Sequence, residues 1–381
     1  MDCVKLVLFF ICQLAFSLSF PHLCPNNQAH ALLQFKHMLT FNPNASDICV
    51  PSNPTTLSWN KSTDCCSWNG VYCDDMTGQV IELDLSCIGL QDRGVSGRHG
   101  LKCSSRPGPG SGRDNIWSDY LYGLRFELYN FELLLKNLTQ LRVLDINLVN
   151  ISPTIPLNFS SYLTTLLLPR SQLRGILPER VFHLSNLESL DLSYSSLTGP
   201  IPSNEFKSNT LEAVVLDQNQ LQGTIPKSLL DQQELYYLTL SQNNFSGQID
   251  STVCNLKRLI MLDLGSNHLN GTIPHCLGEI SGLEVLGLNN NHFSGKINQH
   301  LILKTRLNII NLYGNKLKGK VPPSLINCTY LEFLDLGNNK LNDPFPSLLG
   351  GLPGLKILSL RSNKFHGPIS DSRTENLFTK I

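Results

Sequence analysis

One sixteen-residue pattern recurs through the chain at an almost constant interval. It reads L-x-x-L-x-L-x-x-N-x-L-x-G-x-I-P, and a clear copy is LIMLDLGSNHLNGTIP from Leu259. Copies start at Leu141, Leu163, Leu187, Leu211, Leu235, Leu259, Leu283, Leu307, Leu331 and Leu355, so the first interval is 22 residues and the next eight are 24. An earlier partial copy, VIELDLSCIGL, starts at Val80. A fixed period of this length is typical of a solenoid built from stacked repeats.

Each part of the repeat predicts a different piece of backbone. Leucines alternate with polar residues in LxxLxL, which predicts a short strand with one buried face. The following asparagine has an amide that satisfies backbone groups where the strand bends, so stacked copies predict an asparagine ladder. The GxIP element fixes φ and ends pairing, which predicts extended or short 3₁₀ structure on the outer side. Eleven stacked units bury one continuous core.

The N-terminus and the asparagine sequons indicate the secretory route. Residues 4–18 are largely apolar and end in small-residue pairs, which predicts a signal peptide over residues 1–19; a buried helix or a signal anchor is the alternative. Ten cysteines remain after cleavage, in a compartment where disulfides persist. Eight N-x-S/T sequons are predicted glycosylation sites, at Asn44, Asn60, Asn137, Asn150, Asn158, Asn244, Asn270 and Asn327.

The region before the repeats carries a second pattern. An amphipathic helix is expected over Asn27–Phe41, followed by LSWNKSTDCCSWNGVYCDDMTGQVIELDLS. Together with GxIP, this resembles the leucine-rich-repeat receptor-like proteins of plants, closest to the tomato leaf-mould resistance class. The resemblance implies an α/β solenoid, a plant-specific leucine-rich-repeat superhelix with a parallel β-sheet on its concave face and a disulfide-bonded N-terminal cap. It also implies the bridges Cys24–Cys65 and Cys66–Cys73, and leaves the pairing of Cys49, Cys87 and Cys103 open.

We divide the chain into seven parts. They are a signal peptide (1–19), the cap (20–79), a first repeat (80–91), an irregular Gly/Ser/Arg-rich segment (92–122), a partial or degenerate repeat (123–140), ten 24-residue repeats (141–370) and a C-terminal end (371–381). Residues 92–122 are either an inserted loop or a rearranged or mis-spliced sequence. Compared with the family, the chain is expected to be a truncated ectodomain without a transmembrane segment.

Two further cysteines are expected to form a bridge between neighbouring repeats. Cys254 and Cys276 are 22 residues apart in adjacent 24-residue repeats, so they fall on neighbouring coils of the outer return. Such positions lie within the ~4.4–6.8 Å Cα separation that a disulfide requires. Cys328 has no partner in an adjacent repeat and is expected to be a buried thiol.

No catalytic or metal-binding motif stands out. The chain lacks GxSxG, HExxH, GxxxxGK[ST], an EF-hand loop and a CxxC pair, so we expect neither an enzyme nor a cofactor. His268 and His292 share one repeat position, but no carboxylate or thiolate joins them, and surface histidines are the expectation. Balanced charge, with 30 Lys and Arg against 30 Asp and Glu, disfavours a nucleic-acid-binding protein.

The concave face is the expected recognition surface. Positions three, five, seven and eight of each repeat point to it. Position three forms an apolar series, which is either a binding seam or only support for strand pairing: Tyr237, Met261, Val285, Ile309, Phe333 and Ile357. Aromatic and Arg side chains dominate interface hot spots. The candidate ligand-binding residues are Tyr194, Gln218, Tyr237, Gln242, Asp263, Asn289, Asn311, Tyr313, Phe333, Asp335 and Arg361.

The resemblance implies a non-enzymatic recognition module of a plant defence receptor. It would bind a peptide, protein or glycan outside the cell or at the plasma membrane, and the full-length form would signal through a partner receptor kinase. A secreted inhibitor of microbial wall-degrading enzymes is the alternative, although such inhibitors carry a further cap cysteine where this chain has Gly70. A non-functional receptor fragment is the third reading.

Overall fold

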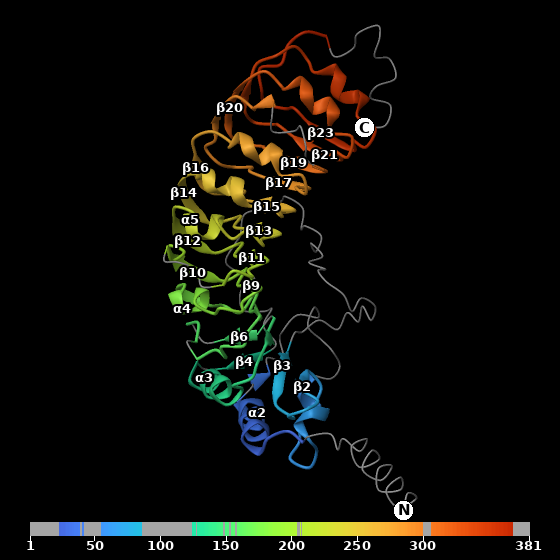
Figure 1. Ribbon diagram of the computed structural model, residues 1–381. Helices are drawn as coiled ribbons and strands as arrows, with labels where there is room; N and C mark the ends of the chain where they lie inside the picture. The colour runs from blue at the N-terminus through green and yellow to red at the C-terminus, as the bar shows by residue number, and fades with distance from the viewer. Residues whose placement is uncertain are drawn as a thin grey trace, which may run out of the picture.

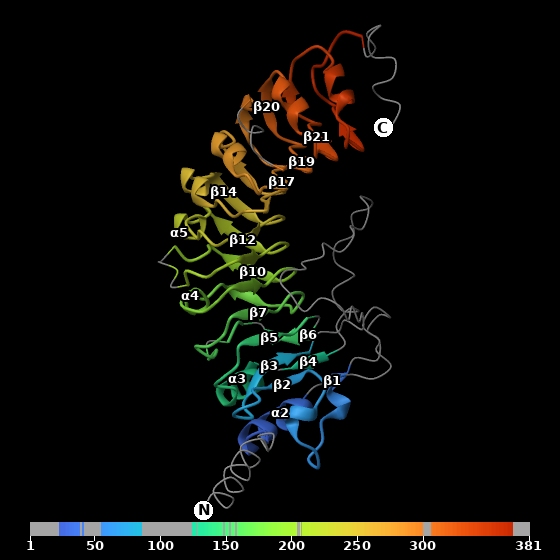
Figure 2. The same ribbon diagram turned by 45° about the vertical axis from the view of Figure 1, so that its right-hand side comes forward.

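The protein is an elongated, curved solenoid (Figures 1 and 2). The computed structural model describes residues 23–38, 40–41, 55–85, 124–126, 128–147, 149–151, 154–156, 158–203, 206, 208–299 and 306–368. The predicted signal peptide, the segment 92–122, the C-terminal end and four predicted positions, Asn44, Cys49, Cys87 and Cys103, lie outside these residues.

A twelve-stranded sheet runs the length of the solenoid. Eleven of its strands are parallel, and a cap strand joins one edge antiparallel. In spatial order they are β2 (Val71–Cys73), β3 (Val80–Asp84), β5 (Val143–Asp145), β7 (Thr165–Leu167), β9 (Ser189–Asp191), β11 (Ala213–Val215), β13 (Tyr237–Thr239), β15 (Met261–Asp263), β17 (Val285–Gly287), β19 (Ile309–Asn311), β21 (Phe333–Asp335) and β23 (Ile357–Ser359). The solenoid, its parallel sheet and its eleven repeat strands are therefore confirmed.

The asparagine ladder forms as predicted. Asn267 is typical: its Nδ2 donates to the carbonyls of Leu240, at 3.0 Å, and Leu264, at 3.2 Å, and its Oδ1 accepts from the Phe245 amide at 2.9 Å. Each amide thus bonds its own repeat and the preceding one. The same arrangement is made by Asn219, Asn243, Asn291, Asn315, Asn339 and Asn363.

Shorter strands form side sheets beyond the ladder (Figure 1). One contains β8 (Arg174–Ile176), β10 (Ser196–Gly199), β12 (Gln220–Gly223), β14 (Asn244–Gln248) and β16 (His268–Asn270); another contains β18 (Ser294–Gly295), β20 (Lys316–Gly319) and β22 (Lys340–Leu341). Short helices complete the outer side. Four are 3₁₀ helices, as GxIP predicted: η4 (Ser251–Asn255), η5 (His275–Glu279), η7 (Pro323–Asn327) and η8 (Ser347–Gly351). The other two, α4 (Glu179–Phe182) and α5 (Lys227–Leu230), are single-turn α-helices.

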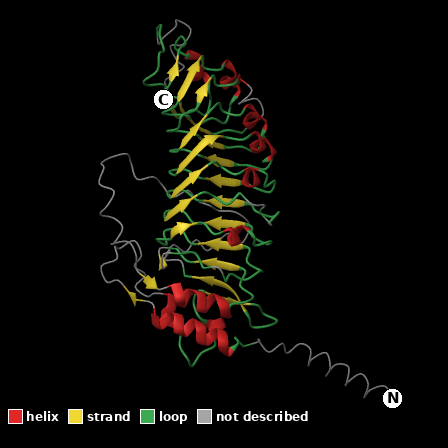
Figure 3. Ribbon diagram, turned by 90° about the vertical axis from the view of Figure 1, so that its left-hand side faces the viewer, coloured by secondary structure: helices red, strands yellow, loops and turns green. Residues whose placement is uncertain are grey.

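The N-terminal cap packs two helices at one end of the solenoid (Figure 3). Helix α2 (Asn26–Met38) packs against α3 (Leu128–Asn137), and two 3₁₀ turns, η2 (Thr55–Ser58) and η3 (Cys65–Ser67), lie between α2 and β2. Trp59 is buried and stacks on Trp68 with ring centroids 5.6 Å apart. The bridges Cys24–Cys65 and Cys66–Cys73 are present, with Cα atoms 5.6 and 5.5 Å apart.

The expected end of the first helix was wrong. The helix ends at Met38, and Thr40–Phe41 form strand β1, antiparallel to β4 (Leu124–Phe126), which in turn pairs with β6 (Val149–Ile151). Thr and Phe favour the extended conformation. Their pairing partners, Arg125 for Thr40 and Leu124 for Phe41, are 85 and 83 residues away in the chain, so local periodicity does not predict the pairing.

The cap and the repeats form one continuous structure. Strands β3 and β5 pair directly through Glu82 and Val143, which are 61 residues apart (143 minus 82), whereas Thr165 and Ser189 on β7 and β9 are 24 apart. Gln28 of α2 adds side-chain bonds, accepting from the Val80 amide at 2.9 Å and donating to the Asn137 carbonyl at 3.1 Å. The long interval between β3 and β5 therefore leaves the sheet register intact.

The cysteines of the outer side behave as expected. Cys254 in η4 and Cys276 in η5 form a disulfide with Cα atoms 5.5 Å apart. Cys328 is a buried free thiol, and burial raises its pKa to about 11, so it stays protonated.

Candidate functional site

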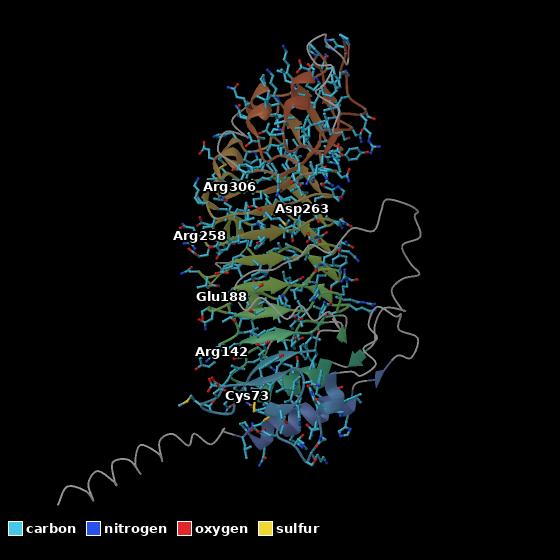
Figure 4. All side chains as sticks on the ribbon, turned by 90° about the vertical axis from the view of Figure 1, so that its right-hand side faces the viewer. Cys73, Arg142, Glu188, Arg258, Asp263 and Arg306 are labelled. Carbon is cyan, nitrogen blue, oxygen red and sulfur yellow. A yellow bond between two sulfur atoms is a disulfide. The ribbon has the colours of Figure 1, made fainter. Side chains whose placement is uncertain are left out.

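The face of the long sheet that points away from the leucine core is the candidate site. In the strands from β5 to β21 the central residue, such as Leu238 or Leu262, is buried, so its neighbours on either side point outward. Figure 4 faces this side of the molecule, with Asp263 labelled on the strands and Arg142, Glu188 and Arg258 along one edge. Every candidate ligand-binding residue lies on one of these strands or within three residues after it.

The C-terminal half of the face carries an apolar column. Strand pairing places its members side by side, in the order Tyr237, Met261, Val285, Ile309, Phe333 and Ile357. Ile309 is 36% exposed and Ile357 53% exposed, and the other four are partly exposed. The column spans six strands at ~4.8 Å spacing and presents a continuous apolar strip to solvent.

A cation–π contact lies beside this column. The Arg361 guanidinium carbon is 5.2 Å from the centroid of the Tyr313 ring, although the two residues are two repeats apart. Gly337 stands between them, and a Cβ there would lie 3.1 Å from Tyr313 Cδ2. The missing side chain at Gly337 allows Arg361 to cross the intervening strand, and such contacts contribute about 0.5–1 kcal/mol at exposed sites.

The eighth residue of the repeats adopts a left-handed backbone conformation. Tyr194, Gln218 and Gln242 all have φ between 52° and 55°. This conformation turns the chain out of the strand and places these side chains at the edge of the face. Arg170 holds the same position in the preceding repeat and stacks over the Tyr194 ring at 4.3 Å.

Glycines make room for two other candidates. A Cβ on Gly287 would lie 2.4 Å from Asp263 Oδ1, and a Cβ on Gly265 would lie 2.6 Å from Asn289 Oδ1. Both polar side chains therefore lie flat across a glycine of the adjacent repeat. Asn311 and Asp335 lie side by side in the pairing of β19 with β21.

The N-terminal half of the face is acidic. Asp84 and Asp145 are direct strand partners, and Asp191 and Asp217 follow two and three strands further along. Burial, reinforced by the carboxylates of Asp84, Asp191 and Glu82, raises the pKa of Asp145 to about 7. Burial also raises the pKa of Asp191 and of Asp217, against the opposing effect of hydrogen bonds from Ser193 and Ser241. A cationic group beside these carboxylates would favour their charged forms.

Sequence reasoning missed the Asp84–Asp145 pair at the N-terminal end of this face. Asp84 and Asp145 both occupy the fifth position of LxxLxL, in VIELDLS and LRVLDIN, so the pattern contained the signal. The 61-residue interval between β3 and β5 hid their adjacency.

The described residues offer no clear metal centre. Their one cluster of possible ligands is Cys24, Asp64, Cys65 and Cys66 in the cap. All three sulfurs are engaged in disulfides, and Asp64 Oδ1 accepts from the Cys24 and Cys66 amides. A disulfide sulfur is not the thiolate that a metal requires. The rings of His268 and His292 lie 6.1 Å apart without such a partner between them.

The predicted glycosylation sites differ in exposure. Asn60, Asn158, Asn244, Asn270 and Asn327 are exposed, whereas Asn137 is half-buried. The Nδ2 atom of Asn137 donates to the Leu133 carbonyl at 2.8 Å. An N-linked glycan would be attached to this same nitrogen, so the hydrogen bond disfavours glycosylation of the folded chain at Asn137. The side chain of Asn150 lies outside the described set. Glycosylation at these sites stays a prediction.

The comparisons agree with this architecture. A model described as leucine rich repeat N-terminal domain matches residues 25–74, and leucine rich repeat models match residues 186–206, 233–293, 306–328 and 330–352. The fold and the concave face therefore define a capped leucine-rich-repeat protein.

More particular similarities point to plant receptors. The chain is 48% identical over 246 residues to "Receptor-like protein Cf-9" of Solanum pimpinellifolium, which covers 50% of this chain and 28% of that protein. The chain is thus a leucine-rich-repeat protein similar to receptor-like proteins of the Cf-9 class, and it spans little more than a quarter of the length of these curated relatives.

Two solved structures extend the comparison. The plant peptide hormone receptor RGFR1 in complex with RGF2 is 32% identical, with a TM-score of 0.59 over 63% of this chain and 38% of that one. A TDR receptor structure is 25% identical, with a TM-score of 0.58 over 63% of this chain and 42% of that one. Within the described residues, no helix is long and apolar enough to cross a bilayer.

Proposed function

We propose that the chain is an extracellular recognition module that binds an extended peptide along its concave face. The observation that carries the proposal is the division of this face into an acidic half and an apolar half. The Asp84–Asp145 pair lies at one end, and the column from Tyr237 to Ile357 lies toward the other. A ligand with basic side chains at one end and apolar side chains at the other complements both halves.

The relatives support a peptide over other ligands. RGFR1 is described as a peptide hormone receptor, and its solved complex contains RGF2. A flexible peptide fits a long, gently curved sheet because it can lie across many strands. The residues assigned to contact it are the eleven candidates given above, together with Asp84 and Asp145.

Signalling is proposed to require a second protein. The full-length receptor would act through a receptor kinase, as the resemblance to receptor-like proteins implies. This part of the proposal predicts that the full-length receptor co-purifies with a kinase after ligand addition. Ligand-dependent signalling in cells that lack every receptor kinase would contradict it.

One observation disfavours the enzyme-inhibitor alternative. Gly70 has a φ of 76°, and a Cβ there would lie 2.1 Å from the Asp84 carbonyl oxygen. A cysteine side chain does not fit at this position without moving β3. The cap is therefore built differently from the inhibitor caps that carry a cysteine there.

The test is selection of ligands from a displayed library of random linear peptides on the full chain. Peptides enriched on the wild-type protein should combine basic with apolar residues. Phe333→Ala and Tyr313→Ala should each weaken their binding by about 1–3 kcal/mol, as measured by calorimetry. Glu279→Ala, on the outer helix η5, is the matched control and should bind like the wild type.

The opposite pattern would reject the proposal. If Glu279→Ala abolished binding while Phe333→Ala and Tyr313→Ala had no effect, with unchanged circular dichroism, the concave face would not be the binding surface. If the selected peptides contained no basic residues, the proposal that the acidic half binds basic side chains would be wrong.

A further inference from the structure

A grid of lysines covers the side sheet formed by β18, β20 and β22. The pairing of Gly295 with Leu317 places Lys296 beside Lys318, and Lys318 pairs directly with Lys340. Lys320 directly follows β20 and lines the same groove as Lys318. All of these side chains are exposed, as is Lys364 on the next repeat.

The lysines line a groove of about 880 Å³. Its base includes the buried side chains of Ile297 and Val321, and Gln299 and Asn342 add amide groups. The aliphatic part of Lys296 lies over Gly319, where a Cβ would be 3.1 Å from Lys296 Cγ. The groove thus combines a row of ammonium groups with hydrogen-bonding amides.

The positive charge of this groove is not balanced locally. The sequence contains no Asp or Glu between Glu284 and Glu332, although six Lys or Arg residues occur there. Among the described residues, the salt bridges join other pairs, such as Lys227–Asp250 and Lys356–Glu332. Asp343 is the nearby carboxylate, and it accepts from the Val321 amide at 3.1 Å. Five lysines that repel one another favour a polyanion.

The geometry of the grid favours a polymer that runs along the solenoid. Lys296, Lys318 and Lys340 recur once per strand, at a spacing of ~4.8 Å along the solenoid. A lysine ammonium is a point charge that pairs with a single carboxylate, unlike the bidentate fork of arginine. The strand amides under the grid are already paired, so the surface offers no edge for a peptide backbone.

The neighbouring side sheet carries predicted glycans, but this one does not. Asn244 on β14 and Asn270 on β16 are exposed sequon asparagines, whereas no sequon falls on β18, β20 or β22. No predicted glycan is therefore attached to the strands that carry the lysines.

We propose that this groove binds an acidic polysaccharide that carries one carboxylate on each sugar. The carboxylates pair with the lysine columns, and the sugar hydroxyls bond to Gln299 and Asn342. The groove lies on the side sheet and not on the concave face, so this site is independent of the proposed peptide ligand. Failure of one proposal leaves the other standing.

The test measures binding of the full chain to immobilised oligogalacturonate, a linear polymer of this type, at several salt concentrations. Wild-type protein should bind, with affinity falling as salt rises. Lys318→Gln/Lys340→Gln should bind about tenfold more weakly. Lys136→Gln/Lys257→Gln removes the same charge elsewhere and should bind like the wild type.

Three competitors separate the possible sources of the signal. Methyl-esterified oligogalacturonate, which lacks the charges, should not compete, whereas the free acid should. Equal competition by poly-glutamate, or equal binding to phosphatidylserine vesicles, would replace the polysaccharide with an acidic protein or a membrane and overturn the proposal. Equal binding by the two double variants would overturn the site itself.

Discussion

At the scale of single residues, the side-chain contacts of the concave side are of two kinds: some are made by one position in every repeat, and others need two positions together. The asparagine ladder follows from one residue per repeat, and it forms at all seven predicted asparagines from Asn219 to Asn363. The Arg361–Tyr313 contact needs a glycine between them, which no single-repeat pattern encodes. The acidic pair Asp84–Asp145 likewise depends on strands that are distant in the chain.

The acidic pair makes stability depend on pH. Because the pKa of Asp145 rises from 3.8 to about 7 on folding, the native state holds this proton more tightly than the unfolded state. Its contribution to stability is therefore complete below about pH 4 and is lost as pH rises through 7. We expect Asp145→Asn to reduce the loss of stability between pH 5 and pH 7 by on the order of 1–2 kcal/mol, measured by denaturant unfolding.

Asp75→Asn provides the control for this measurement, since Asp75 is an exposed cap residue away from the acidic row. It should leave the pH profile unchanged. If Asp145→Asn and the wild type had parallel profiles, Asp145 would titrate normally in the folded protein.

At the scale of elements, the outer side of the solenoid is held by contacts between successive short helices. Helix η4 packs against α5 on one side and against η5 on the other. Each helix has only four or five residues, too few to be stable alone. GxIP predicted extended or short 3₁₀ structure here, and the α-helical turns α4 and α5 depart from that prediction.

The Cys254–Cys276 bridge should stabilise this outer side. It closes a loop of 22 residues, and a loop of this size corresponds to about 3 kcal/mol in the chain-entropy description. We expect Cys254→Ser/Cys276→Ser to lower the free energy of unfolding by about 2–4 kcal/mol, measured by guanidinium titration. Cys328→Ala, which removes a buried thiol without breaking a bridge, should cost less.

A reducing agent gives an independent check on the same bridge. The double variant should respond less to reduction than the wild type, because it has one bridge fewer to lose. Equal stability of the double variant and the wild type would show that the bridge constrains nothing in the unfolded chain.

At the scale of the whole molecule, periodicity was sufficient to predict the solenoid, its repeat count and its buried leucines. It was insufficient for the junction between the cap and the array, where β1 and β4 pair across distant parts of the chain. The direct pairing of β3 with β5 was equally hidden. Contacts between successive repeats recur every 24 residues and can be predicted from the period, whereas each junction contact occurs once and leaves no periodic signal in the sequence.

The junction predicts that residues 92–122 are dispensable for folding. Strand β9 ends at Asp191 and β10 begins at Ser196, so a regular repeat crosses between sheets in four residues. Excision of residues 92–122 would leave a connection of seven residues between Leu85 and Leu124, namely 86–91 and 123. We expect the excised protein to melt within a few degrees of the wild type by differential scanning calorimetry. Loss of cooperative melting would show that the segment is required for the fold.

The bridge on the outer side also determines how the protein would respond to tension. A repeat array pulled from its ends gives way one repeat after another, since each repeat contacts only its neighbours. The link between Cys254 and Cys276 removes 22 residues from the chain that can be drawn out, roughly 75 Å of contour length. Under load the two linked repeats near the middle of the array therefore lengthen less on unfolding than the other repeats do. This difference lasts as long as the disulfide stays oxidised.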